Sequence, residues 1–188
     1  MELEATCTDA SDCKLFAREF VMNNFSSEKL GHIFRDASGQ NPDGGNRAIC
    51  VTHANNCILH GREADCLLTG LSCQPVSVTR RHRFSLGAVE SHPEYRSYDA
   101  VLAILEARDI KCGAIEEVMG FAARSKANPT QPSPLEELVG CILALGKYDI
   151  KIITLDCFTF VKFQRKRLSQ NYTYTSFDLK QPKLAQTQ

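Results

Sequence analysis

The chain has 188 residues, of which 43% are hydrophobic and 23% are charged, proportions typical of one ordinary globular domain. Its 22 basic and 22 acidic residues cancel, so no global positive charge marks a nucleic-acid-binding protein. No apolar run is long enough to span a bilayer, and the acidic start lacks the basic and apolar regions of a signal peptide.

The hydrophobic pattern alternates strands with helices along the chain. In chain order we expect strands at 3–7, 32–36, 65–69, 112–118 and 148–155, and helices at 12–24, 98–108 and 134–145. The first helix would be capped by Ser11 or Asp12, with one apolar face formed by Leu15, Phe16, Phe20 and Val21. Residues 37–46 predict a loop, residues 49–60 are ambiguous between a loop and a short helix, and the tail from residue 181 predicts disorder.

Alternating strands and helices of this length predict an α/β fold, with a mostly parallel sheet and helices on both faces. A Rossmann-like domain is the natural candidate for this arrangement. The glycine-rich turn that follows the first strand of nucleotide-binding folds is not recognisable, because Gly39, Gly44 and Gly45 lie outside a strand–turn–helix context.

The nine cysteines are scattered and contain no Cys-x-x-Cys pair, which argues against a disulfide framework and against a structural zinc site. The spacings are too wide and uneven for a zinc knuckle in the pairs Cys7/Cys13, Cys50/Cys57 and Cys66/Cys73. The five histidines show no metal-ligand spacing either, so we expect no metal site. A reducing compartment is expected, with most thiols buried as small apolar side chains.

Cys73 is the exception among the cysteines. The apolar run from residue 65 ends at Gly70, and Cys73 follows closely, flanked by Ser72, Gln74 and Pro75. In α/β folds, ligands and catalytic groups gather in the loops after the carboxyl ends of strands. The position of Cys73 therefore indicates chemistry rather than packing.

Several segments, in this order, resemble the motifs of the cytosine-5 DNA methyltransferases. Residues 71–77, Leu-Ser-Cys-Gln-Pro-Val-Ser, resemble the catalytic Pro-Cys-Gln loop, with Ser72 in place of proline. Residues 113–121, Gly-Ala-Ile-Glu-Glu-Val-Met-Gly-Phe, resemble the Glu-Asn-Val motif, with Glu117 in place of asparagine. Residues 163–168, Phe-Gln-Arg-Lys-Arg-Leu, resemble the Gln-x-Arg-x-Arg motif. Residues 7–9 and 34–36 resemble two strand ends that contact the cofactor.

This resemblance implies a catalytic role for four residues. Cys73 would add to carbon 6 of a flipped-out cytosine, and Glu116 would hydrogen-bond the ring nitrogen. Arg165 and Arg167 would orient the base and its phosphate.

The cofactor implied by the resemblance is S-adenosylmethionine, with contacts from Asp9, Asp36 and Gln74. Ordinary roles stay open beside these assignments: an inert thiol at Cys73, a surface ion pair at Glu116, and helix-cap or turn roles at Asp9 and Asp36. The run 165–167 could equally be a solvated basic turn.

The resemblance covers only the middle of a full enzyme. The resemblance does not extend to the first strand with its glycine-rich turn, to the target-recognition region or to the closing C-terminal motif of such an enzyme. We therefore expect a partial catalytic domain at 1–170, followed by a C-terminal extension at 171–188, and weak binding of S-adenosylmethionine by this chain alone. The chain would be a fragment or a decayed copy of such an enzyme.

Three functions stay open from the sequence. The first is methylation of cytosine in DNA, with RNA not excluded as the substrate. The second is a non-catalytic relic that binds nucleic acid or a partner protein, and the third is an unrelated thiol-dependent enzyme of Rossmann-like fold. A nuclear location follows from the expected substrate and the basic run, and no membrane contact is expected. Target sequence and oligomeric state are not predicted.

Overall fold

The computed structural model describes residues 6–26, 29–41, 49–55, 57, 63–77, 80, 85, 89–125, 128–156 and 171–179. The chain divides into two compact units, residues 1–63 with 99–109 and residues 64–98 with 110–188. Among the described residues, no helix has both the length and the apolar character that crossing a membrane requires.

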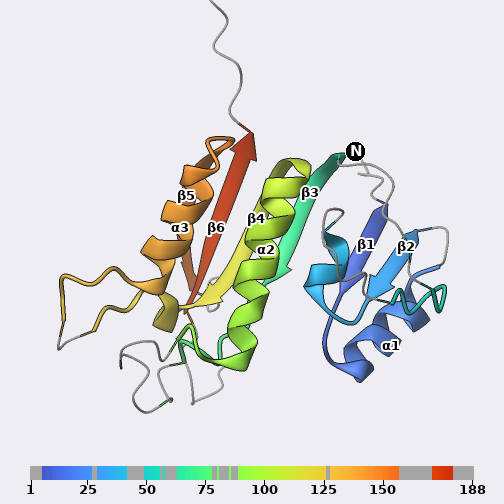
Figure 1. Ribbon diagram of the computed structural model, residues 1–188, viewed down its shortest axis with the longest axis horizontal. Helices are drawn as coiled ribbons and strands as arrows, with labels where there is room; N and C mark the ends of the chain where they lie inside the picture. The colour runs from blue at the N-terminus through green and yellow to red at the C-terminus, as the bar shows by residue number, and fades with distance from the viewer. Residues whose placement is uncertain are drawn as a thin grey trace, which may run out of the picture. The chain divides into compact units, whose positions relative to one another are not determined.

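The first unit is built on two parallel strands (Figure 1). Strand β1 (Cys7–Ser11) pairs with β2 (Leu30–Phe34), with Asp9 opposite His32. Parallel neighbours need a crossover, which α1 (Leu15–Asn24) supplies, and the 3₁₀ helix η1 (Ala37–Gln40) follows β2. The predicted strand at 32–36 is confirmed with shifted bounds, whereas the first strand lies four residues later than the sequence predicts.

Helix α1 does not bury the face that the sequence predicts. Leu15, Phe16 and Phe20 are 59%, 72% and 64% exposed, whereas Arg18 is buried. Lys14, not Ser11 or Asp12, is the N-cap residue and makes no side-chain capping bond, although the Asp12 carboxylate accepts from the Lys14 N–H over 2.7 Å. An amphipathic stripe identifies the apolar face of a helix but not what covers that face.

A buried ion pair holds the first unit together. The Arg108 Nη1 atom lies 3.0 and 2.9 Å from the two carboxylate oxygens of Asp9, and both side chains are almost fully buried. The Gln40 side-chain amide donates to the same carboxylate over 2.6 Å. Arg108 directly follows helix α2 (Arg96–Ala107), so the carboxylate joins β1, η1 and the end of α2.

The second unit contains a four-stranded sheet in the order β3-β4-β6-β5. Its strands are β3 (Glu63–Gly70), β4 (Asp109–Val118), β5 (Tyr148–Asp156) and β6 (Asn171–Leu179). Strand β6 lies between β4 and β5 and is antiparallel to both, so that β4 and β5 run in the same direction (Figure 1). The sequence analysis predicts β3, β4 and β5 but no strand at 171–179, although the alternation of tyrosine and threonine at 172–175 is typical of a strand.

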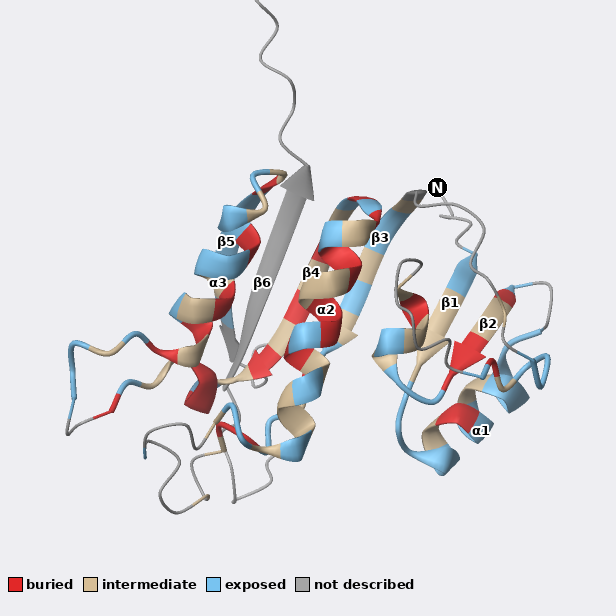
Figure 2. Ribbon diagram, in the orientation of Figure 1, coloured by how far each residue is buried: buried red, intermediate tan, exposed pale blue. Residues whose placement is uncertain are grey.

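Helix α3 (Pro134–Ala144) begins where the sequence predicts, at a proline that suits the first turn of a helix. Ser133 and Glu136 form a capping box, in which the Glu136 carboxylate accepts from the Ser133 N–H over 2.7 Å. Leu135, Leu138 and Ile142 are buried, and the buried residues of α3 lie along one side of the helix (Figure 2). The helix contacts β5 and the 3₁₀ helix η3 (Met119–Ala122).

The prediction that most thiols are buried is wrong for the described cysteines. Of these eight, Cys50 is buried, two are intermediate, and five are exposed: Cys7, Cys13, Cys66, Cys73 and Cys141. Residue type alone does not decide burial, because a cysteine on a strand points to whichever face its register dictates.

A methyl group at Gly31 should open the β1–β2 pair. A Cβ atom built there would lie 2.5 Å from the carbonyl oxygen of Thr8, which is backbone and cannot move aside. We expect Gly31→Ala to destabilise the first unit by about 2 kcal/mol or more, measured by hydrogen exchange of the β1 and β2 amides. Gly140→Ala is the matched control, because nothing lies within 4 Å of its Cβ position. It should stabilise α3 by about 0.5–1 kcal/mol. Unchanged protection in Gly31→Ala would contradict the close approach.

Candidate active site

Cys73 is exposed to solvent on the loop after β3, and buried residues on either side of it anchor this loop. Leu71, Pro75 and Val76 are buried, whereas Cys73 and Gln74 are exposed. The Val76 N–H donates to the carbonyl of Cys73 over 3.2 Å, which closes a turn. The Arg80 guanidinium donates to the carbonyl of Pro75 over 2.9 Å. The buried residues therefore anchor the loop, and the turn carries the exposed thiol.

Glu116 adjoins the start of this loop. The Leu71 N–H donates to the Glu116 carbonyl over 3.4 Å, and a Cβ built on Gly70 would lie 3.2 Å from Glu116 Oε2. Glu116 is half-buried on β4, and this burial raises the pKa of its carboxyl above the usual range. Glu116 therefore lies beside the first residue of the loop that carries Cys73.

Glu117 has a role that the sequence does not predict. It shares the buried face of β4 with Ile115 and is 2% exposed. Its carboxylate lies 3.0 Å from the hydroxyl of Tyr98 and accepts from the Val118 N–H over 3.1 Å. Burial raises the pKa of Glu117 to about 7, although these two hydrogen bonds oppose the rise. In the sequence, Glu117 appears only as a departure from a motif.

Tyr98 connects Glu117 to the Cys73 loop. Its hydroxyl lies 3.0 Å from the Ser72 carbonyl as well as 3.0 Å from Glu117. A hydroxyl has one proton, so both contacts are fully satisfied when a protonated Glu117 donates to Tyr98 and Tyr98 donates to Ser72. The Tyr95 ring stacks on Tyr98 at 4.9 Å between centroids, and the Phe121 ring lies at 5.4 Å. This packing fixes the backbone next to Cys73.

The predicted cofactor residues of the first unit have local partners. Both oxygens of Asp9 accept hydrogen bonds, from Thr8, Gln40 and Arg108. Asp36 is exposed and accepts from the Ser38 N–H over 2.8 Å, which caps η1. Asp36 therefore has the cap role that the sequence leaves open, whereas Asp9 has neither a helix-cap nor a turn role but a buried ion pair with Arg108. Arg165 and Arg167 lie outside the described residues.

The raised pKa of Glu117 should make stability depend on pH. Its folded-state pKa of about 7 exceeds the ordinary value of 4.5 for a glutamate carboxyl, so the folded state binds more protons between these pH values. The stabilisation is complete below about pH 4.5 and is lost as the pH rises through about 7, by about 3 kcal/mol. Urea unfolding at pH 5 and pH 8 measures this difference.

Glu117→Gln provides the comparison for that measurement, because glutamine retains a hydrogen-bonding group but has no charge to bury. We expect the variant to lose most of the extra destabilisation at pH 8. An equal loss of stability in both proteins would place the pH dependence elsewhere.

No protein-family model and no curated protein matches the chain. Solved structures that resemble it include the Entamoeba histolytica methyltransferase EhMeth, with a TM-score of 0.54, 18% identity, and coverage of 93% of this chain and 45% of that chain. The Schizosaccharomyces pombe Dnmt2 methyltransferase matches with a TM-score of 0.51 and 18% identity, covering 95% of this chain and 42% of that chain. The chain therefore spans less than half the length of either structure. What it shares with them is the α/β, Rossmann-like fold of a methyltransferase.

Proposed function

We propose that this chain is part of a cytosine-5 methyltransferase in which Cys73 attacks the target base. The observation that carries the proposal is the exposed thiol on an anchored loop after β3, adjoining a half-buried carboxyl on β4. Two methyltransferases with the same fold support the reaction class. Cytosine specificity rests on the order of the sequence motifs.

The chemistry of cytosine explains why a thiol and an acid are needed. Carbon 5 of cytosine is a poor nucleophile. When the Cys73 thiolate bonds to carbon 6 and the ring nitrogen takes a proton from Glu116, the ring becomes an enamine that is nucleophilic at carbon 5. Because burial raises the pKa of Glu116, its carboxyl keeps this proton to a higher pH than an ordinary side chain does.

The methyl donor implied by the resemblance, S-adenosylmethionine, does not fit the Asp9 position as it stands. A carboxylate offers about four acceptor positions, and those of Asp9 are already used by Thr8, Gln40 and Arg108. A ribose hydroxyl would have to displace the buried Arg108 pair. Asp9 therefore does not offer a free ribose contact in this arrangement, and cofactor contacts at Asp36 and Gln74 remain part of the proposal.

The Asp9 geometry favours a second candidate function. A chain that keeps the base-binding loop without a cofactor contact would serve as a non-catalytic module that binds nucleic acid. In either case the base would be extruded from its stack, and Arg165 and Arg167 would bind its phosphate. Formation of a covalent bond to the base separates the two candidates.

Oligonucleotides carrying pyrimidin-2-one at the target position test the nucleophile without a methyl donor, because this ring accepts a thiol at carbon 6 more readily than cytosine does. We expect the full chain to form an adduct seen by intact mass, and Cys73→Ser to form none. Cys66→Ser is the control, since Cys66 is a nearby exposed thiol on β3. DNA and RNA versions of the probe identify the substrate class.

Glu116→Gln should slow the adduct by about 10²- to 10⁴-fold, the usual contribution of general acid–base catalysis. An adduct that survives Cys73→Ala would remove the proposed nucleophile. Nucleic-acid binding without any adduct in the native chain would favour the non-catalytic module.

The occupied Asp9 carboxylate leads to a separate expectation for the donor. Isothermal titration of the chain with S-adenosylmethionine should show no micromolar binding, because the ribose contact competes with the buried Arg108 pair. Micromolar affinity would show that the donor binds without Asp9 or displaces Arg108.

A further inference from the structure

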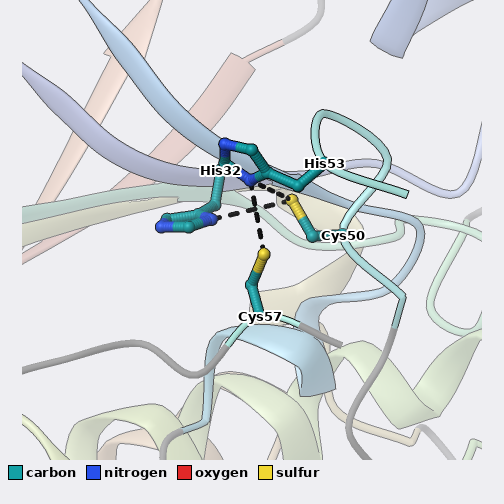
Figure 3. Close-up of side chains that lie close together, drawn as sticks. All are labelled: His32, Cys50, His53 and Cys57. Atoms are coloured by element: carbon teal, nitrogen blue, oxygen red, sulfur yellow. Dashed lines mark hydrogen bonds between the residues drawn. The ribbon is translucent and has the colours of Figure 1, made fainter. Parts of the chain in front are cut away.

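Four sulfur and nitrogen ligands gather in the first unit, whereas Cys73 and Glu116 belong to the second. His32 lies on β2, whereas Cys50, His53 and Cys57 come from the segment that folds back on this strand. The metal-binding atoms of these four side chains all lie within 4.8 Å of one another. Figure 3 shows the four side chains converging on a common point. The sequence predicts no metal site because these ligands are unevenly spaced.

Backbone hydrogen bonds hold this segment against β2. The Val51 N–H donates to the carbonyl of Ile33 over 2.7 Å, and the Cys50 N–H donates to the carbonyl of Asn55 over 2.9 Å. Between them, Ala54 has a φ of 53°, in the left-handed region that non-glycine residues rarely occupy. This turn brings His53 and Cys57 back toward Cys50. The path of the backbone at this turn therefore brings the ligands together.

The distances in the cluster match a tetrahedral site. The Cys50 sulfur lies 3.6 Å from His32 Nδ1 and 3.4 Å from His53 Nδ1, and the Cys57 sulfur lies 3.3 Å from His53 Nδ1 (Figure 3). Zinc bonds of about 2.3 Å to sulfur and about 2.0–2.1 Å to nitrogen give a tetrahedron with edges of about 3.3–3.8 Å. These three contacts already have this length, and no pair of ligand atoms has to close by more than about 1 Å.

We propose that His32, Cys50, His53 and Cys57 bind one Zn²⁺ ion as a Cys₂His₂ site. Two thiolates and two imidazoles favour zinc over the hard cations that prefer oxygen ligands. The Cys50 and Cys57 thiols bind as thiolates, and any proton that they carry is released to solvent. Four protein ligands fill the tetrahedron, so the ion would be structural. This site is independent of the proposed methyl transfer.

The location explains what such an ion would do. A two-stranded sheet is marginal by itself in water, and the first unit has only two described strands. Because the ligands come from β2 and from the segment that covers it, zinc would cross-link the two. Binding free energy would then add to the stability of the unit.

Metal analysis of the full chain after purification with zinc tests the proposal. We expect one bound Zn²⁺ per chain, and a Tm that rises by several degrees when zinc is added to the metal-free protein. With Co²⁺ in place of zinc, tetrahedral binding should give intense visible absorption and a thiolate charge-transfer band. Less than stoichiometric zinc, or a Co²⁺ spectrum without these bands, would overturn the site.

Two substitutions assign the ligands without removing the buried thiol. Cys57→Ser and His53→Gln change an intermediate and an exposed side chain, so we expect both variants to fold. Each should weaken zinc binding by more than about tenfold. Substitution of a residue that only hydrogen-bonds a metal ligand already causes a loss of about this size. Cys13→Ser, an exposed thiol of the same unit outside the cluster, is the control and should bind zinc normally. Native affinity in both ligand variants, or an equal loss in Cys13→Ser, would refute the assignment.

Discussion

The hydrogen-bonded chain from Glu117 through Tyr98 to Ser72 is the interaction on which the candidate site depends. An isolated carboxylate on the buried face of a strand would be costly, because burial disfavours its charged form. Tyr98 and the Val118 N–H satisfy its oxygens, and the raised pKa allows it to be neutral near physiological pH. The same tyrosine hydroxyl contacts the backbone beside Cys73. The tyrosine that makes the burial of Glu117 tolerable therefore also holds the backbone beside the Cys73 thiol.

Asp9 in the first unit is also a buried carboxylate, but it is stabilised by an ion pair. Its buried carboxylate is paired with the guanidinium of Arg108, and Gln40 and Thr8 occupy the remaining acceptor positions. A buried pair of this kind is hard to break, because removing one partner leaves an uncompensated charge. Asp9 is therefore well suited to joining β1 to η1 and poorly suited to releasing an oxygen to a ligand. This is the strongest physical argument for the non-catalytic alternative.

A zinc site formed by these four residues cannot be recognised from their spacing in the sequence. Regular spacing of cysteine and histidine identifies a metal site only when the ligands lie on one short local motif. Here one ligand lies on a strand and three lie on an irregular turn with a left-handed alanine, so their convergence depends on the path of the backbone. The exposed apolar face of α1 is a similar case, since its pattern is visible but its environment is not.

Hydrophobic period and capping residues act locally, so the alternation of strands and helices and the helix that begins at Pro134 can be predicted from the sequence. Its motifs also predict that Cys73 and Glu116 share one site, since the carboxyl ends of neighbouring strands meet at one edge of a sheet. Strand β6 was not predicted, because its inclusion between β4 and β5 depends on pairing with segments far away in the chain. Three features are seen only in the folded chain: Glu117 faces the interior, Asp9 is paired with Arg108, and four dispersed ligands converge. Each of these depends on strand register and on contacts between distant residues, which local patterns do not encode.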